Sequence, residues 1–237
     1  MYEKFAQFYD RAQGDAPTGL AKWITGRALK YAPDAMSVLE LGCGTGAVLD
    51  RLPASWQKTG VDISEAMLSQ ARAKCLNISL LKGDIRDLHL QRRFDLVTCV
   101  YDTVNHLVGP SDWERVFRVA RAHLNPGGLF LFDMHTLSRL RKMPTDPAWV
   151  HDFDGNTLIM SIREAGVDLV EWTIRVFRHE GEFYSLHTES ILETSLPLER
   201  VAVLLNNSGL DVIEMNDGPD TPATEDSRRV LFTCRAA

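Results

Sequence analysis

Three glycines at alternate positions, Gly42, Gly44 and Gly46, follow an apolar run and precede a helical pattern. Glycine lets the backbone turn tightly and approach a ligand closely, and the helix that begins after such a turn presents unpaired amide N–H groups. A plain strand-to-helix connection rarely needs three glycines. The pattern therefore predicts a turn that holds a large, partly charged ligand.

The glycines alone leave the ligand class open, because their spacing also satisfies the dinucleotide fingerprint. Asp62 follows Gly42 by twenty residues, the distance of a ribose-binding acid in that fingerprint. Glu40, however, precedes the first glycine by two positions, where a carboxylate could face an ammonium group but would oppose a pyrophosphate. Asp84 ends a third strand-like run, where it could accept a hydrogen bond from an adenine amino group. These two acids disfavour an NAD-dependent oxidoreductase.

Strand and helix patterns alternate through residues 37–134, the part of the chain that must position these groups. Continuous apolar runs lie at 37–41, 59–62, 78–81, 94–100 and 129–133, and helical patterns at 47–52, 65–74 and 113–124. Such an alternation is typical of a parallel sheet covered on both faces. In residues 2–31, apolar spacings of three and four predict helices that precede the sheet, with a break near residues 14–19.

The pattern changes at about residue 148. Runs rich in β-formers at 157–164, 169–178 and 183–192 are separated by turns that contain glycine, which predicts an inserted antiparallel sheet. A helix at 198–208 and strands at 212–215 and 230–234 follow. We therefore expect one domain over residues 1–237, with N-terminal helices in 1–36, a core sheet from 37–134 and 194–237, and a β-rich insertion in 135–193. The insertion should form a wall over the ligand site.

Four ordered motifs resemble those of class I S-adenosylmethionine-dependent methyltransferases. Residues 40–46 are similar to the first motif of that family, 61–64 to the second, 83–85 to the third, and 125–129 to the turn before the fifth strand. The resemblance implies an α/β Rossmann-like fold with a seven-stranded, mostly parallel sheet, helices on both faces and an antiparallel last strand. The N-terminal helices would form a lid beside the inserted sheet.

The same resemblance implies S-adenosylmethionine as the cofactor. The glycines would line its methionine part, Asp62 would bind the ribose hydroxyls, and Asp84 with the Ile85 amide would read the adenine. Tyr101 directly follows the strand that faces the methyl donor. The predicted cofactor site consists of Glu40, Gly42, Gly44, Gly46, Asp62, Ile63, Asp84, Ile85 and Tyr101.

The helix at 2–10, the stretch 101–107 and the β-rich insertion look like those of bacterial small-molecule methyltransferases, a group that includes amino-sugar N-methyltransferases. We therefore expect methyl transfer to N or O of a small molecule, and the resemblance does not identify the acceptor. A protein that binds S-adenosylmethionine and regulates without turnover is an alternative, and an NAD-dependent oxidoreductase is a weaker one.

The candidate catalytic residues are Tyr101, His106, His135 and Tyr9. The first three follow strands at the carboxyl edge of the predicted sheet, where α/β proteins bind ligands, and His is well suited to proton transfer near neutral pH. His187 in the insertion could close over them. Each has an ordinary alternative, since loop histidines are often surface residues and Tyr9 could simply pack its helix. No two histidines have metal-ligand spacing on one element, so no metal site is predicted.

Composition limits the partners. The 237 residues are 45% hydrophobic and 24% charged, as in ordinary globular proteins, and the net charge of −6 with scattered basic residues argues against nucleic acid. The four cysteines lie far apart without a C-x-x-C pair, which favours reduced thiols. No apolar run approaches the roughly 20 residues of a membrane span, and the N-terminus does not resemble a signal peptide. We expect a cytoplasmic protein, and a homodimer is possible.

Overall fold

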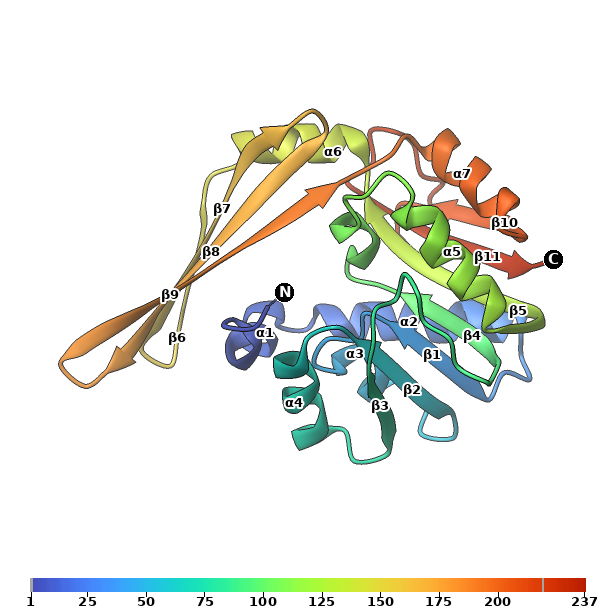
Figure 1. Ribbon diagram of the computed structural model, residues 1–237, viewed down its shortest axis with the longest axis horizontal. Helices are drawn as coiled ribbons and strands as arrows, with labels where there is room; N and C mark the ends of the chain where they lie inside the picture. The colour runs from blue at the N-terminus through green and yellow to red at the C-terminus, as the bar shows by residue number, and fades with distance from the viewer. Residues whose placement is uncertain (1, 219) are drawn as a thin grey trace.

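A computed structural model describes residues 2–218 and 220–237, in which two β-sheets form the framework. The larger sheet has seven strands in the order β10-β11-β5-β4-β1-β2-β3 (Figure 1). Six of them, β10 included, point in one direction, and β11 is antiparallel to both of its neighbours. This confirms the predicted Rossmann-like sheet and its antiparallel last strand. The strands are β1 (Ser37–Leu41), β2 (Gln57–Asp62), β3 (Ile78–Lys82), β4 (Phe94–Cys99), β5 (Leu124–His135), β10 (Leu210–Asn216) and β11 (Arg229–Ala236).

Helices cover both faces of this sheet. Because side chains alternate along a strand, Val38 packs in a cluster with Ile24, whereas its neighbour Leu39 packs in the opposite cluster with Phe117. Both faces are therefore buried, which explains why these strands are continuously apolar. One face carries α5 (Asp112–Ala122) and α7 (Leu198–Asn207), and the other carries α2 (Ala16–Tyr31), α3 (Ala47–Arg51) and α4 (Glu65–Lys74).

The second sheet is a four-stranded antiparallel meander, and Figure 1 shows it projecting from the larger sheet as an arm. It contains β6 (Trp149–Phe153), β7 (Asn156–Gly166), β8 (Leu169–Glu180) and β9 (Phe183–Thr194). The β6–β7 hairpin turns on Asp154 and Gly155, whose φ angles of 48° and 78° suit a two-residue turn of type I′. Helix α6 (Leu137–Lys142) and the short helix η2 (Met143–Thr145) connect β5 to the arm.

Helix α1 (Ala6–Gln13) lies between the arm and α4 (Figure 1). Phe5 and Phe8 pack in one cluster with Leu158 and Ile174 of the arm. Apolar packing therefore holds α1 against the four-stranded sheet.

Several boundaries differ from those predicted, among them the first helix, which spans Ala6–Gln13 and not residues 2–10. The break between the first helices covers only Gly14 and Asp15, because Gly14 takes a φ of +56° and α2 begins at once with Pro17 in its first turn. Strand β5 begins at Leu124 and not at residue 129, since a register shift against β4 accommodates residues 125–128. None of the helices described is long and apolar enough to cross a membrane.

Candidate active site

The glycine turn between β1 and α3 has the backbone that its sequence predicts. Gly42, Gly44 and Gly46 have φ angles of +75°, +52° and +73°, values that other residues rarely adopt. A Cβ atom on Gly42 would also lie 2.5 Å from the side chain of Thr103, whereas one on Gly44 would meet no atom within 4 Å. The turn is thus packed against the protein at Gly42 and open at Gly44.

Asp62 at the end of β2 is held in place by two backbone amides. Its Oδ2 accepts a hydrogen bond of 2.8 Å from the Gly44 N–H, and its Oδ1 accepts one of 2.8 Å from the Ser64 N–H. Burial raises the pKa of Asp62, and the amide hydrogen bonds oppose that shift. Each carboxylate oxygen keeps a further lone pair for a ligand hydroxyl.

Glu40, near the end of β1, is 3% exposed, and its Oε2 accepts no hydrogen bond from the described residues. Burial, followed by the negative charge of Asp62, raises the pKa of Glu40 to about 8. An unpaired carboxylate oxygen in a cavity is costly unless a ligand supplies a donor or a positive charge. Glu40 therefore fits the ammonium group of a methionine moiety.

Asp84, which follows β3, is paired with Arg86. The Arg86 Nε lies 2.9 and 3.1 Å from the two Asp84 oxygens, and these bonds lower the pKa of Asp84. Arg86 also contacts Asp112 at 3.2 Å. The carboxylate that was expected to read adenine is therefore shared with a guanidinium group, and its role toward adenine stays a prediction.

Two adjoining cavities open beside these groups. The first cavity is lined by eight of the nine predicted cofactor residues, Ile63 and Ile85 among them. Gly46 is the one that does not line it. The second, of about 640 Å³, lies among α1, the carboxyl ends of β4 and β5, and the arm. Four residues line both cavities: Tyr2, Tyr9, Gln13 and Tyr101.

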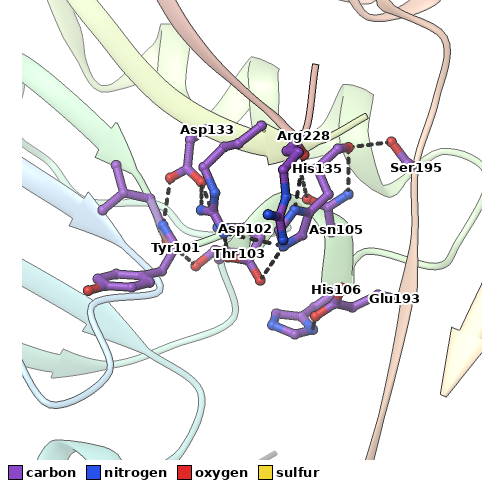
Figure 2. A network of polar contacts seen from close by, with 12 residues as sticks. Tyr101, Asp102, Thr103, Asn105, His106, Asp133, His135, Glu193, Ser195 and Arg228 are labelled. Atoms are coloured by element: carbon purple, nitrogen blue, oxygen red, sulfur yellow. Dashed lines mark hydrogen bonds and ion pairs between the residues drawn. The ribbon is translucent and has the colours of Figure 1, made fainter. Parts of the chain in front are cut away.

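Tyr101 and Asp102 after β4 have left-handed backbones, with φ angles of 60° and 50°. The buried carboxylate of Asp133 holds them, since it accepts hydrogen bonds of 2.6 and 3.1 Å from their two amides. Arg229 pairs with Asp133 and lies 2.7 Å from Asp102 Oδ1. Figure 2 shows this network, in which the Tyr101 ring points away from the carboxylates. The Tyr101 hydroxyl is buried and has no hydrogen-bond partner among the described residues.

His135 at the end of β5 lines the second cavity. Its Nε2 lies 3.2 Å from Arg229 Nη2 and 3.7 Å from Asp102 Oδ2, and its Nδ1 lies 3.3 Å from the Arg228 carbonyl oxygen. Because guanidinium can only donate, these contacts place the ring proton on Nδ1. Burial lowers the pKa of His135 to about 4, so the ring is neutral at pH 7. Arg229 occupies the lone pair that a general base would need.

His106 in the short helix η1 (Thr103–His106) faces the arm. Its Nε2 is 3.3 Å from the Tyr2 hydroxyl. Its Nδ1 is 3.8 Å from Oε1 of Glu193 in β9, and Figure 2 shows these two side chains next to each other. Burial lowers the pKa of His106. Asn105 sets this geometry, because its amide nitrogen donates to the Thr194 carbonyl at 2.8 Å and its amide oxygen accepts from the His135 N–H at 2.9 Å.

Asp102, His135 and Glu193 offer ligand atoms within 4.8 Å of one another, a spacing that could suit a metal ion. Arg229 contacts two of the three, and its positive charge competes with a metal ion for the same atoms. The absence of a metal site thus stays a prediction. His187 lies outside both cavity walls, with its ring centre 6.4 Å from that of Phe8.

Sequence reasoning did not single out Asp102, Asp133, Glu193 and Arg229. Arg229 is directly opposite His135 in the antiparallel pairing of β11 with β5, and Glu193 reaches the site at the end of an arm strand. The register that brings these residues together is not visible in a single sequence. The only signal in the sequence was that Asp102, Asp133 and Glu193 lie near the ends of predicted strands.

Comparisons with known proteins agree with this fold and geometry. Residues 38–128 match a family model described as a methyltransferase domain. YqeM of Bacillus subtilis (strain 168), provisionally named a methyltransferase, is 29% identical over 98% of this chain and 96% of its own. A dTDP-4-amino-2,3,4,6-tetradeoxy-D-glucose N,N-dimethyltransferase of Saccharopolyspora spinosa is 37% identical over 43% of this chain and 41% of its own.

Among solved structures, an S-adenosylmethionine-dependent methyltransferase from Clostridium acetobutylicum ATCC 824 is similar to the whole chain. It has a TM-score of 0.86 and 27% identity, covering 100% of this chain and 99% of the other. Together with the seven-stranded sheet and the glycine turn, these likenesses identify a class I S-adenosylmethionine-dependent methyltransferase. The chain is similar to the bacterial enzymes of this class that methylate small molecules.

Proposed function

We propose that this enzyme transfers a methyl group from S-adenosylmethionine in the first cavity to N or O of a small molecule in the second. The observation that carries this proposal is the shared border between the cavities. Tyr2, Tyr9, Gln13 and Tyr101 belong to both walls, so ligands in the two cavities would meet at one largely aromatic boundary. Methyl transfer requires such an in-line approach of two bound molecules.

The donor roles rest on the geometry of the first cavity. Asp62 would accept hydrogen bonds from the ribose hydroxyls, Glu40 would face the ammonium group, and Gly44 would line the methionine part at the open side of the turn. Ile63 and Ile85 would flank the adenine, with Asp84 at its amino group. S-adenosylmethionine, when bound, supplies a methyl group attached to a positively charged sulfur. On transfer, the sulfur becomes a neutral thioether, which is the leaving group.

The chain itself would contribute position and exclusion of water. Tyr9 and Tyr101 stand at the border of the cavities, and the buried hydroxyl of Tyr101 is free to orient an acceptor. His135 would be a polar contact of the acceptor in its neutral form, and His106, which is also neutral, lines the first cavity beside Tyr2 of the shared border. The carboxylate network behind Tyr101 fixes the boundary in a backbone conformation that is otherwise unfavourable.

Incubation of the protein with isotopically labelled methyl donor and a mixture of cell metabolites tests the proposal. We expect S-adenosylhomocysteine to be released and one labelled small molecule to accumulate, as detected by mass spectrometry. Binding of S-adenosylhomocysteine without any methylated product would favour a regulatory role without turnover. A cytoplasmic location and a homodimer remain predictions.

A further inference from the structure

Glu193 is an unusual group in the wall of the second cavity. The residue is 3% exposed, and its Oε2 accepts no hydrogen bond within the described part of the chain. Its Oε1 lies 3.8 Å from His106 Nδ1, which also lacks a hydrogen-bond partner among those residues. A buried carboxyl with an unused oxygen indicates a ligand that donates to it.

The charges around Glu193 favour a positive ligand. Asp102, 16% exposed, is compensated by Arg229 at 2.7 Å, and Arg229 also pairs with Asp133. One positive charge thus faces two carboxylates before Glu193 is counted. Arg139 is paired with Asp146.

The remaining neighbours do not supply a cation to Glu193. His106 and His135 have pKa values lowered by burial, so both rings are neutral at pH 7. Tyr2 and Trp172 face the same space and carry no charge, and Arg228 is an exposed residue of the wall. A cationic acceptor would therefore be the missing partner of this carboxyl.

We propose that Glu193 is a catalytic residue that binds an amine acceptor as its ammonium ion and takes one proton from it before methyl transfer. This inference rests on the proposed function and extends it from N or O to the nitrogen of an amine. One N–H bond of the ammonium group breaks, its electron pair stays on nitrogen as the nucleophile, and the proton forms an O–H bond with the Glu193 carboxylate. The nitrogen then accepts the methyl group, and Glu193 returns the proton to solvent when the product leaves.

The electrostatic surroundings suit this proton transfer. Burial and the negative charge of Asp102 raise the pKa of Glu193, while the indole N–H of Trp172, which forms no hydrogen bond of standard geometry with any described residue, and the charge of Arg229 oppose the shift. Transfer from an ordinary ammonium group of pKa about 10 to an ordinary glutamate of pKa about 4 is disfavoured by about six powers of ten. Each unit by which the pKa of Glu193 rises removes one of those powers.

Carbon-13 NMR of protein labelled at the glutamate carboxyl carbons tests the ground state of this group. The wild-type spectrum should contain a resonance that is missing from Glu193→Gln and that ionises well above pH 4.5. Glu40→Gln identifies the other buried glutamate that titrates late. Glu182→Gln, a change at an exposed residue in the tip of the arm, serves as the matched control.

Two probes of similar shape then distinguish an amine from an alcohol. At pH 7, cyclohexylamine should bind and move the Glu193 resonance to its ionised position, whereas cyclohexanol should leave it unchanged. Because charge-assisted hydrogen bonds are lost, Glu193→Gln should bind the amine at least about tenfold more weakly. Ionisation of Glu193 near pH 4.5, no response to the amine, or an equal response to both probes would overturn the proposal.

Kinetics with the acceptor found by the labelled-donor screen complete the test. Glu193→Gln should lower kcat by about 100-fold or more and leave the affinity for S-adenosylhomocysteine unchanged, and Glu193→Asp should recover part of kcat. Unchanged kcat in Glu193→Gln would overturn the role of Glu193 and leave the proposed function standing. Absence of S-adenosylhomocysteine binding by the wild type would instead contradict the proposed function.

Discussion

At the scale of single residues, the site depends on two buried carboxyl groups in adjoining cavities. Glu40 belongs to β1 beside the glycine turn and Glu193 to β9 of the arm, and each has an oxygen without a hydrogen-bond partner among the described residues. Burial raises the pKa of both, so both are ready to ionise when a positively charged ligand arrives. Asp102 and Asp133 differ from them because both are paired with Arg229.

Binding of S-adenosylhomocysteine should release a proton from Glu40. In the free protein its pKa of about 8 keeps the carboxyl protonated at pH 6 to 7, and the ligand ammonium group should lower that pKa. Affinity should therefore rise with pH between 6 and 8, by up to about tenfold per unit, and level off above 8. Calorimetry in two buffers of different ionisation enthalpy measures the proton release. Glu40→Gln should remove it, and a pH-independent affinity of the wild type would refute the assignment.

Tyr101→Phe and His135→Gln should lower turnover more than cofactor affinity. Both side chains line the acceptor cavity, and neither is a hydrogen-bond partner of Glu40 or Asp62 in the donor cavity. Since Arg229 occupies the lone pair of His135, we expect the two side chains to orient the acceptor, and their loss should cost less in kcat than the about 100-fold or more of a lost base. Steady-state kinetics of the two variants would measure this loss, and an unchanged kcat in both would exclude these side chains from catalysis.

At the scale of elements, polar contacts hold α1 and the residues before it from two sides. The Asp10 carboxylate accepts a 2.5 Å hydrogen bond from Thr45 in the glycine turn and pairs with Lys74 of α4. On the other side, Glu189 of the arm accepts hydrogen bonds from the backbone amides of residues 3–5, at 3.1 to 3.3 Å. Helix α1 therefore joins the glycine turn to the arm, and its role as a lid stays a prediction.

Removal of either set of polar contacts should loosen α1. We expect Asp10→Asn and Glu189→Gln to accelerate amide hydrogen exchange in α1 and to speed the dissociation of S-adenosylhomocysteine, since few other polar contacts hold the helix. Asp154→Asn, which removes only the exposed pair with Arg11, is the matched control. Exchange rates in α1 that equal those of the control would show that apolar packing alone holds this helix.

Elements with a strong local signal could be predicted, and contacts between distant elements could not. The positive φ angles of the turn between β1 and α3 require glycine, so the glycines predicted the turn. The alternation of apolar strands with helices predicted a sheet covered on both faces. By contrast, Arg229 reaches His135 through the register of β11 against β5, and Glu193 reaches His106 through the arm. The end of α1 depends on a single glycine conformation at Gly14, which made the predicted break too long.

At the scale of the whole molecule, the buried Glu40 makes stability depend on pH. Its pKa is raised on folding, so between about pH 4.5 and 8 the native state binds a proton that the unfolded state lacks, and stability falls as pH rises through that range. The shift from 4.5 to about 8 corresponds to at most about 5 kcal/mol. Glu40→Gln should therefore raise the Tm of the ligand-free protein at pH 8 and change it little at pH 5. A lower Tm of the variant at pH 8 would show that the carboxylate stabilises the fold.

The identity of the donor ligand is the central claim, because every assigned role depends on it. Calorimetric titration of the wild type with S-adenosylhomocysteine and, separately, with NAD measures it directly. We expect micromolar binding of S-adenosylhomocysteine and no detectable binding of NAD, because the carboxylate of Glu40 favours an ammonium group and opposes a pyrophosphate. Asp62→Ala should weaken S-adenosylhomocysteine binding by about tenfold to a hundredfold, through loss of the ribose hydrogen bonds. Micromolar binding of NAD without binding of S-adenosylhomocysteine would contradict the account.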